Sequence, residues 1–386
     1  MKRKICVVIT ARPSYSRIKT ALTAIQNHEE LELQLVVAAS AMLGRYGEVV
    51  KLMERDGFQP SARIFNVIEG ESLLAAPKTT GLGIIELSTV FDVLKPDIVV
   101  TIADRYETMS TAIAASYMNI PLAHVQGGEV TGNIDEKVRH AITKLADYHF
   151  VASESARQRV LSLGEDNQFV FNTGCPSIDL AKVVREESRS NQDFEPYSKY
   201  GGVGEFVNTS SDYIVILQHP VTTEVDQARN QIEATLHAVL ESELPAVWFW
   251  PNVDVGSDAT SAAIRRFREA FRPKKMHFFK NMEPEDFLRL LIGSRCLIGN
   301  SSVGIRECSF LGVPVVNIGT RQDRRERGCN VIDVPADKLA ISLAISKWLA
   351  SERPPADQVY GGGDAGQRIS ELLAQVPLKF HKTINF

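Results

Sequence analysis

Short β-branched runs alternate with longer amphipathic stretches along almost the whole chain of 386 residues, and this alternation limits the possible folds more than any other feature. Between the runs, apolar residues recur at i, i+3, i+4 and i+7, as Val138, Ala141, Ile142 and Leu145 do, which is typical of a helix. Runs that are apolar on both faces and separated by helices indicate parallel sheets covered on both sides. The expected strands are Ile5–Thr10, Leu33–Ala39, Asp97–Ile102, Pro121–Gln126, Tyr148–Ala152, Gln168–Thr173, Tyr213–Gln218, Ala246–Trp250, Met276–Phe279, Cys296–Gly299 and Val313–Ile318.

The alternation breaks once, over residues 186–212, which are polar, rich in glycine and without apolar periodicity. A chain of this length favours two domains. We therefore expect an N-terminal Rossmann-like domain over residues 1–185, a linker region over 186–212 and a second domain over 213–364. A last helix within 365–386 is expected to complete the first domain. The predicted fold class is α/β, with two Rossmann-like parallel-sheet domains facing across a cleft.

The charge balance and the cysteines exclude several classes of protein. Lys and Arg total 43 against 47 Asp and Glu, a net charge of −4, which argues against a protein that coats nucleic acid or a membrane surface. No apolar run approaches the roughly 18 residues that span a bilayer. The five cysteines are widely spaced and form no CxxC pair, which favours reduced thiols over a disulfide scaffold or a zinc site. The sequence therefore predicts a cytoplasmic protein without a metal.

Polar side chains follow many of the expected strands. Ligands of open parallel sheets bind outside the carboxyl ends of the strands, so these residues are candidates for a site in the predicted cleft. Loops after strands are polar in any protein, and each residue taken singly is weak support. The candidates are Arg12, Asp104, Arg105, Gln126 and Glu129 in the first half and His219, Asn252, Asn300, Ser301, Ser302, Thr320 and Arg321 in the second.

Ser301 and Ser302 stand where a helix would begin after the strand Cys296–Gly299. A helix N-terminus presents unpaired N–H groups suited to phosphate oxygens, although a serine there can also be an ordinary N-cap. Glu307 would lie on the second turn, where it could reach a ribose diol or form a surface salt bridge. The segment therefore predicts either a phosphate site or a plain helix start.

Two arginines and one histidine are the other candidates for binding an anion. The guanidinium groups of Arg12 and Arg105 match the geometry of a pyrophosphate, although arginines in loops are usually just solvated. His219 stands at a strand end and is held by the following proline, so it is the histidine that we favour for a site. His149 lies inside an expected strand and is interpreted as a core histidine.

Two carboxylates are candidates for proton transfer. Asp135 precedes Val138 and Ile142 by three and seven residues, so it tops the buried face of its helix, where it could also serve only as a cap. Asp104 follows another strand end. One carboxylate that accepts a proton and one that donates it are what reversible C–H chemistry beside an anomeric carbon requires.

Taken together, the sequence resembles the hydrolysing UDP-N-acetylglucosamine 2-epimerases of sialic and related nonulosonic acid synthesis, nearly from end to end. The resemblance implies a two-domain fold of the glycosyltransferase B type that holds the nucleotide mainly in its C-terminal half and uses no cofactor. The motifs that support it are TARPSYSR, ADRYE, HVQGGEVTGNIDEKVRHAITKLADYH, GCPSIDL, LQHPVTTE, WPNVDVGS, IGNSSVGIRE and NIGTRQDRRERG.

The resemblance also implies roles for individual residues. Asp104 and Asp135 match catalytic carboxylates of the family. The positions that match contacts to phosphate or nucleotide are Arg12, Ser16 and Arg105 in the first half and His219, Asn252, Met282 (through its backbone), Ser301, Ser302, Glu307 and Arg321 in the second.

Two departures from the family pattern concern catalysis and substrate. A third catalytic carboxylate of the family falls where this chain has Gln126, which cannot act as a base, and Glu129, three residues later, is the candidate substitute. A histidine often found after the second strand is replaced by Ala41. Because that histidine would lie near the sugar, the identity of the sugar stays open.

The expected function is therefore a hydrolysing UDP-N-acetylglucosamine 2-epimerase. It would release UDP and free N-acetylmannosamine through a 2-acetamidoglucal, for sialic or nonulosonic acid synthesis. Alternatives are the same chemistry on a UDP-2,4-diacetamido-2,4,6-trideoxyhexose of the legionaminic acid pathway, a non-hydrolysing epimerase, a glycosyltransferase of the same fold and a non-catalytic UDP-sugar sensor. The expected partners are a UDP-N-acetyl sugar and further copies of the chain in a homodimer or homotetramer, with no nucleic acid and no membrane.

Overall fold

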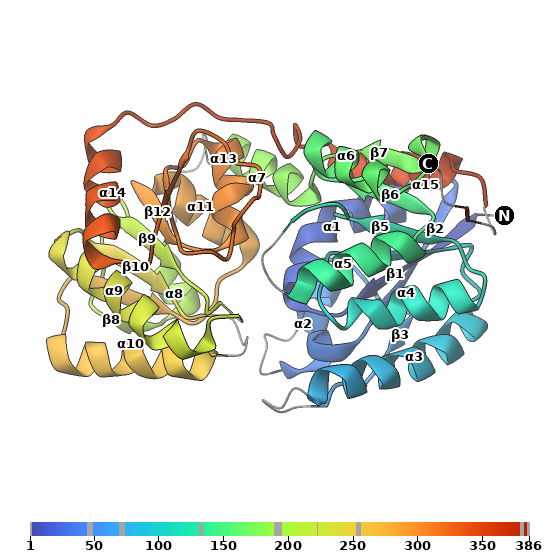
Figure 1. Ribbon diagram of the computed structural model, residues 1–386, viewed down its shortest axis with the longest axis horizontal. Coiled ribbons are helices and arrows are strands. Elements are labelled where there is room, and N and C mark those ends of the chain that lie inside the picture. Colours follow the sequence, from blue (N-terminus) through green and yellow to red (C-terminus); the bar gives the residue numbers. More distant parts are fainter. Residues whose placement is uncertain are drawn as a thin grey trace. The chain divides into compact units, whose positions relative to one another are not determined.

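Two compact units make up the chain in the computed structural model, which describes residues 2–44, 49–68, 74–130, 134–188, 195–221, 223–251, 256–378 and 382–383. Unit 1 contains Met1–Val130, Ile134–Asp179 and Tyr360–Phe386, and unit 2 contains Leu180–Val359. The chain leaves unit 1 after Asp179 and returns to it at Tyr360, so that its last helix packs within the unit in which the chain began (Figure 1).

The sheet of unit 1 is parallel throughout the described residues, with the strand order β3-β2-β1-β4-β5-β6-β7. Chain order reverses between the neighbours β1 and β4, and ligands of such sheets bind beside the carboxyl ends of the strands at that point. The strands are β1 (Arg3–Ile9), β2 (Leu31–Val37), β3 (Ala62–Arg63), β4 (Ile98–Ile102), β5 (Leu122–Val125), β6 (Tyr148–Val151) and β7 (Val170–Asn172).

Both faces of this sheet are covered by helices, which explains why its strands read as continuous apolar runs. Along β1, Ile5, Val7 and Ile9 belong to one buried cluster, with side chains of α1, α2 and α15. Cys6 and Val8 belong to another, with side chains of α3, α4 and α5. The helices are α1 (Arg12–Asn27), α2 (Val49–Arg55), α3 (Ala75–Leu94), α4 (Thr108–Tyr117), α5 (Ile134–Leu145), α6 (Glu154–Ser162) and α15 (Ala365–Gln375), with 3-10 turns η1 (Ala39–Met42) and η3 (Asn167–Phe169). Helix α7 (Pro176–Glu187) begins in unit 1 and ends in unit 2.

A buried carboxylate attaches the last helix to the rest of unit 1. Asp179 accepts hydrogen bonds from the backbone N–H groups of Ala365 (2.9 Å) and Gly366 (2.7 Å) at the start of α15, and from the hydroxyl of Thr20 on α1 (2.9 Å). A Cβ at position 366 would stand 2.6 Å from the carbonyl carbon of Thr20. Glycine is therefore needed for this close approach of α15 to α1.

The sheet of unit 2 has the order β14-β13-β12-β9-β10-β11-β8 among the described residues and is parallel except for β8. Chain order reverses here between β9 and β12. The strands are β8 (Val203–Gly204), β9 (Ile214–Leu217), β10 (Ala246–Phe249), β11 (Met276–Phe279), β12 (Cys296–Gly299), β13 (Val315–Ile318) and β14 (Val331–Val334). The helices are α8 (Pro196–Tyr200), α9 (Ala228–Glu241), α10 (Ser257–Phe271), α11 (Pro284–Gly293), α12 (Ser302–Ile305), α13 (Glu307–Leu311) and α14 (Lys338–Ala350), with the 3-10 turn η4 (Val225–Gln227).

The predicted strands all have counterparts in the two sheets, whereas β3, β8 and β14 were not predicted. The largest difference lies in the expected linker region, whose described part forms α8 and β8 and joins the second sheet. The strand is held by single polar contacts that leave no periodicity in the sequence. His277 makes two of them, through Nδ1 to the carbonyl of Glu205 (3.1 Å) and through Nε2 to that of Gly201 (2.9 Å).

The attachment of α15 can be tested by replacing Asp179. We expect Asp179→Ala to lower the free energy of unfolding by about 1–3 kcal/mol, because it leaves two buried N–H groups without an acceptor. Asp364→Ala is the matched control, since that neighbouring carboxylate is exposed and makes no capping hydrogen bond. Urea denaturation measures both variants. Equal effects of the two substitutions would contradict the assignment.

Candidate active site

A buried arginine organises the carboxyl edge of the unit 1 sheet. Arg139, on α5, is 0% exposed. Its guanidinium donates hydrogen bonds to the carboxylate of Asp104, which follows β4, and to the backbone carbonyl of Glu129 (2.7 Å). Because a buried guanidinium needs a counter-charge, Arg139 fixes Asp104 beside α5.

Three of the predicted carboxylates act on this one arginine. Burial by itself would lower the pKa of Arg139, but the charges of Asp104, Glu129 and Asp135 outweigh it and raise that pKa above its usual value. Asp135 lies four residues before Arg139 and therefore on the same side of α5. The structure thus brings Asp104, Glu129 and Asp135 together around Arg139, a cluster that we call the carboxylate–arginine cluster.

Arg139 was missed in the sequence although a signal for it was present. It stands four residues after Asp135 and three before Ile142, on the helix face that the apolar residues mark as buried. A charged residue at such a position is rarely buried without a partner. Its spacing from Asp135 was the clue to the cluster.

Gln126 directly follows β5 and has a backbone φ of +67°, which is uncommon for a residue other than glycine. Its side chain is buried, and the amide Nε2 lies 2.9 Å from Sγ of Cys175, directly before α7. The same sulfur lies 3.0 Å from the hydroxyl of Ser177. The side chain at this position is therefore held by a thiol, in a backbone conformation of a kind that concentrates at functional sites.

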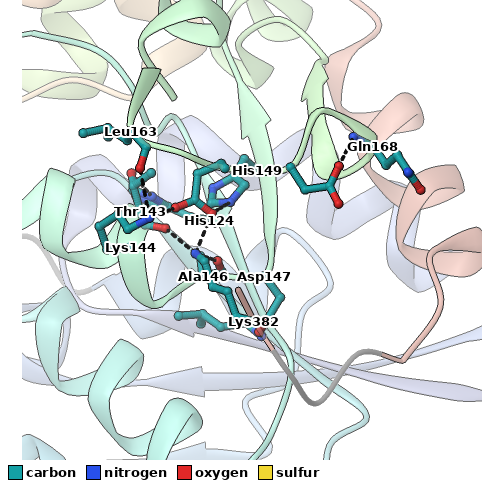
Figure 2. Close-up of polar contacts among 12 residues, drawn as sticks. His124, Thr143, Lys144, Ala146, Asp147, His149, Leu163, Gln168 and Lys382 are labelled. Carbon is teal, nitrogen blue, oxygen red and sulfur yellow. Dashed lines mark hydrogen bonds and ion pairs between the residues drawn. The ribbon is translucent and has the colours of Figure 1, made fainter. Parts of the chain in front are cut away.

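His124, on β5, connects the strand next to the cluster with α5. Its Nδ1 lies 3.2 Å from the hydroxyl of Thr143, and both residues are labelled in Figure 2. Its Nε2 lies 2.9 Å from the carbonyl of Ala103, the residue before Asp104. Burial is the main cause that lowers the pKa of His124 to about 3. The imidazole is therefore neutral, with Nε2–H donating to the carbonyl and Nδ1 accepting from the hydroxyl.

The predicted phosphate-binding residues of unit 1 stand at the same sheet edge. Arg12 begins α1 after β1, and its carbonyl accepts a hydrogen bond from Ser16 Oγ (3.4 Å). Arg105 follows β4 and forms an ion pair with the buried Glu107 (3.2 Å) while its own side chain is 33% exposed. Because β1 and β4 are neighbours, both arginines start from adjacent strand ends.

In unit 2, an asparagine ties together the strand ends at the point where chain order reverses. Asn300 follows β12, and its side-chain amide exchanges two hydrogen bonds of 2.8 Å with the backbone N–H and carbonyl of His219, which follows β9. Gly299 has a φ of +141°, and a Cβ there would stand 2.1 Å from the carbonyl oxygen of Leu217. Asn300 was expected to be a candidate site residue, and in the structure its side chain also links the ends of β9 and β12.

The segment after Asn300 starts a short helix. Ser301 is the N-cap of α12 and accepts a hydrogen bond from the N–H of Val303 (3.4 Å), while Ser302 is the first helical residue. Arg321 (3.2 Å) and Gln322 (2.8 Å) both donate to the carbonyl of Asn300. The N-cap function that the sequence left open is therefore present, and Gln322 is an anchor that the sequence reasoning missed.

The remaining unit 2 candidates differ in how they are placed. Glu307 begins α13, and its buried Oε2 has no hydrogen-bond partner among the residues that the structure describes. Met282 is buried before α11, and its N–H donates to the side chain of Asn281 (2.9 Å). Asn252 lies outside the described residues. Oε2 of Glu307 is therefore a buried oxygen that can still accept a hydrogen bond.

The described part of the chain contains neither a cluster of metal ligands nor a helix that could cross a membrane. No group of three or more His, Cys, Asp or Glu side chains there could hold a metal ion. None of the helices described has the length and apolar character needed to cross a membrane.

Comparisons with known proteins show which family the sequence matches. The family described as UDP-N-acetylglucosamine 2-epimerase matches residues 23–374. The chain is 31% identical to a UDP-N,N'-diacetylbacillosamine 2-epimerase (hydrolyzing) of Legionella pneumophila, over 98% of this chain and 97% of that protein. It is 30% identical to a UDP-N-acetylglucosamine 2-epimerase of Neisseria meningitidis, over 97% and 95%.

Solved structures show the same fold. A crystal structure of UDP-GlcNAc 2-epimerase from Neisseria meningitidis bound to UDP-GlcNAc superposes with a TM-score of 0.82 at 19% identity, over 97% of this chain and all of that chain. The predicted α/β class, with two Rossmann-like sheets of the glycosyltransferase B type, is confirmed.

The neutral state of His124 predicts how stability changes with pH. In the unfolded chain a histidine takes up a proton near pH 6.5, whereas folded His124 does so only near pH 3, so acidification below 6.5 favours the unfolded state. When the pH is lowered from 6.5 to 5, the free energy of unfolding of the unchanged chain falls because of His124. We expect this fall to be about 2 kcal/mol smaller in His124→Asn, which has no imidazole to protonate. Urea titrations at several pH values measure this. Parallel curves for the two proteins would contradict a buried neutral imidazole.

Proposed function

The chain belongs to the UDP-N-acetylglucosamine 2-epimerase family, and from this we propose that it is a hydrolysing 2-epimerase of UDP-linked 2-acetamido sugars. The observation on which the proposal rests is the carboxylate–arginine cluster, because 2-epimerisation requires a proton to leave C2 and another to return to it. The name of the Legionella pneumophila relative supports the hydrolysing reaction.

The reaction that we propose has two stages. In the first, a carboxylate takes the C2 proton, the C1–O bond breaks with its electrons going to UDP, and a 2-acetamidoglucal forms. In the second, water adds its hydroxyl group to C1 and a proton returns to C2 from the opposite face. The sum is substrate plus water giving UDP and a free 2-epimeric sugar. Asp104 and Asp135 supply the proton acceptor and donor.

Gln126 affects which residues can supply the carboxylates of the proposed reaction. An amide cannot take a proton from carbon, so at this position the chain can only offer hydrogen bonds. We propose that Glu129 supplies the third carboxylate, since it is buried and its charge acts on Arg139. Arg139 in turn keeps these carboxylates close together, where their mutual repulsion would otherwise separate them.

For the nucleotide we propose two groups of residues. Arg12, Ser16 and Arg105 would contact the diphosphate, whose departure is favoured by fixed positive charge. Glu307 would accept from a ribose hydroxyl, for which its unpartnered Oε2 is available. The other proposed UDP contacts are His219, Asn252, Met282, Ser301, Ser302 and Arg321.

Two sugars are candidate substrates. UDP-N-acetylglucosamine is the first, from the resemblance in the motifs. The second is UDP-N,N'-diacetylbacillosamine, a UDP-2,4-diacetamido-2,4,6-trideoxyhexose, which the name of the Legionella pneumophila relative favours. Ala41, buried on η1, also favours it, because a methyl group leaves more room for a second acetamido group than an imidazole does. The product would serve sialic acid synthesis in the first case and legionaminic acid synthesis in the second.

We also propose that the enzyme works in the cytoplasm as a homodimer or homotetramer. All five cysteines are free, which suits a reducing compartment. Light scattering coupled to gel filtration measures the oligomeric state, and a monomer at micromolar concentration would contradict that part of the proposal.

One experiment separates the proposed reaction from its rivals. The chain is incubated with each UDP-sugar in deuterated water, and the products are followed by NMR. We expect UDP and a free 2-epimeric sugar with deuterium at C2. Labelled UDP-sugar would indicate the non-hydrolysing enzyme, and turnover that needs an acceptor and leaves C2 unlabelled would indicate a glycosyltransferase. Binding without turnover of either sugar would indicate a sensor.

Substitutions in the cluster test the assignment of the carboxylates. We expect Asp104→Asn and Asp135→Asn each to lower kcat by about 10²–10⁴-fold, the usual contribution of a general acid or base. We expect Glu129→Gln to lower it as well, since Gln126 cannot replace it. Asp92→Asn, at an exposed position of α3, is the control for loss of a carboxylate. Full activity of Glu129→Gln would remove Glu129 from the mechanism.

A further inference from the structure

A second buried carboxylate lies in unit 1 away from the carboxylate–arginine cluster. The side chain of Glu165, between α6 and η3, is 2% exposed. It accepts from Nζ of Lys144 (2.6 Å), Nζ of Lys382 (2.6 Å) and Nε2 of His149 (3.0 Å), residues that Figure 2 shows close together. These donors outweigh burial, the largest single cause, and lower the pKa of Glu165 to about 2. The group is therefore a charged carboxylate that needs its cations.

Lys382 reaches this place from the far end of the chain. Besides Glu165, its Nζ donates to the backbone carbonyls of Thr143 (3.2 Å) and Ala146. These carbonyls lie at the C-terminal end of α5. The last carbonyl groups of a helix have no N–H partner within the helix, and the helix dipole favours a cation there. Lys382 thus provides a C-terminal cap for α5 across 236 to 239 residues of sequence.

The chain before Lys382 is also held to unit 1. The hydroxyl of Tyr148 donates to the carbonyl of Pro377. Arg3 donates to the carbonyls of Leu373 (2.6 Å) and Val376 (2.8 Å). The cap is therefore attached to a segment that follows α15 directly.

The capped helix is the one that holds the carboxylate–arginine cluster. Asp135, Arg139 and Thr143 follow one another at intervals of four along α5, so they share one face of the helix. The hydroxyl of Thr143 bonds to His124, which bonds to the carbonyl of Ala103. Contacts therefore continue without a gap from Lys382 through Thr143 to the residue before Asp104.

We propose that Lys382 is a positioning residue for the reaction: by capping α5 and pairing with Glu165, it fixes the helix that places Asp135 and Arg139. The inference rests on the proposed function. Without the ammonium group, Glu165 retains only Lys144 and His149 as partners among these three donors, and the end of α5 loses the Lys382 donor. A shift of about 1 Å in catalytic groups can lower a rate by about 10²-fold, so the effect falls on kcat.

The test compares a variant that removes the charge with one that keeps it. We expect Lys382→Met to lower kcat at least about 10-fold, with KM and the affinity for UDP within about twofold of the unchanged chain. Lys382→Arg keeps the charge and should retain most of the activity. Lys347→Met is the matched control, an exposed lysine in the last turn of α14, and should change nothing. Ending the chain after Leu378 should reproduce the effect of Lys382→Met.

Amide hydrogen exchange keeps the proposal separate from the proposed function. We expect Lys382→Met to speed exchange in α5 relative to α4, a difference that can be measured without turnover. If the unchanged chain turns over no UDP-sugar, the proposed function fails, and unchanged exchange in α5 would overturn the positioning role as well. A lower melting temperature with unchanged kcat per folded molecule would show that Lys382 stabilises the fold only and would overturn the proposal.

Discussion

The guanidinium of Arg139 has no contact with solvent, and unit 1 is built so that this charge is neutralised. Asp104 comes to it from the end of β4, Glu129 from the loop after β5, and Asp135 from the first turn of the same helix. A buried charge of this kind is strongly destabilising without its partners. The position of α5 against the sheet therefore depends on the ends of two neighbouring strands, and the three carboxylates are held near one another by the cation between them.

Polar side chains join neighbouring elements at the edge of each sheet, but by different chemistry. In unit 1 the neutral His124 bridges the carbonyl of Ala103 and the hydroxyl of Thr143, beside an ionic cluster. In unit 2 the neutral amide of Asn300 pairs with the backbone of His219. The edge in unit 1 thus gathers three carboxylates around Arg139, whereas the edge in unit 2 gathers the amides of Asn300 and Gln322 with the guanidinium of Arg321. This division fits a reaction in which the sugar is altered while the nucleotide is only held.

The chain belongs to the UDP-N-acetylglucosamine 2-epimerase family, and two expected departures from the family pattern concern residues of unit 1. Gln126 replaces a carboxylate and is held by Cys175, so its side chain is fixed in place and unable to take a proton. Ala41 is buried at the position where the resemblance in sequence implies a histidine. Both changes lie in unit 1, on the side of the protein that we assign to the sugar. Differences among relatives in the sugar that they use are therefore expected to arise there.

The sequence by itself determined the strands and the polar residues that follow them, because apolar periodicity and strand ends are local properties of the chain. It could not show that Arg139 is buried, that residues of the expected linker region add a strand to the second sheet, or that Asn300 binds the backbone of His219. Nor could it connect Lys382 with α5. Each of these depends on groups far apart in sequence, and only the packing of strands and helices brings them within hydrogen-bond distance. The tertiary structure therefore decided which of the polar residues named from the sequence became a cluster, because burial forces charges to find partners that local sequence cannot supply.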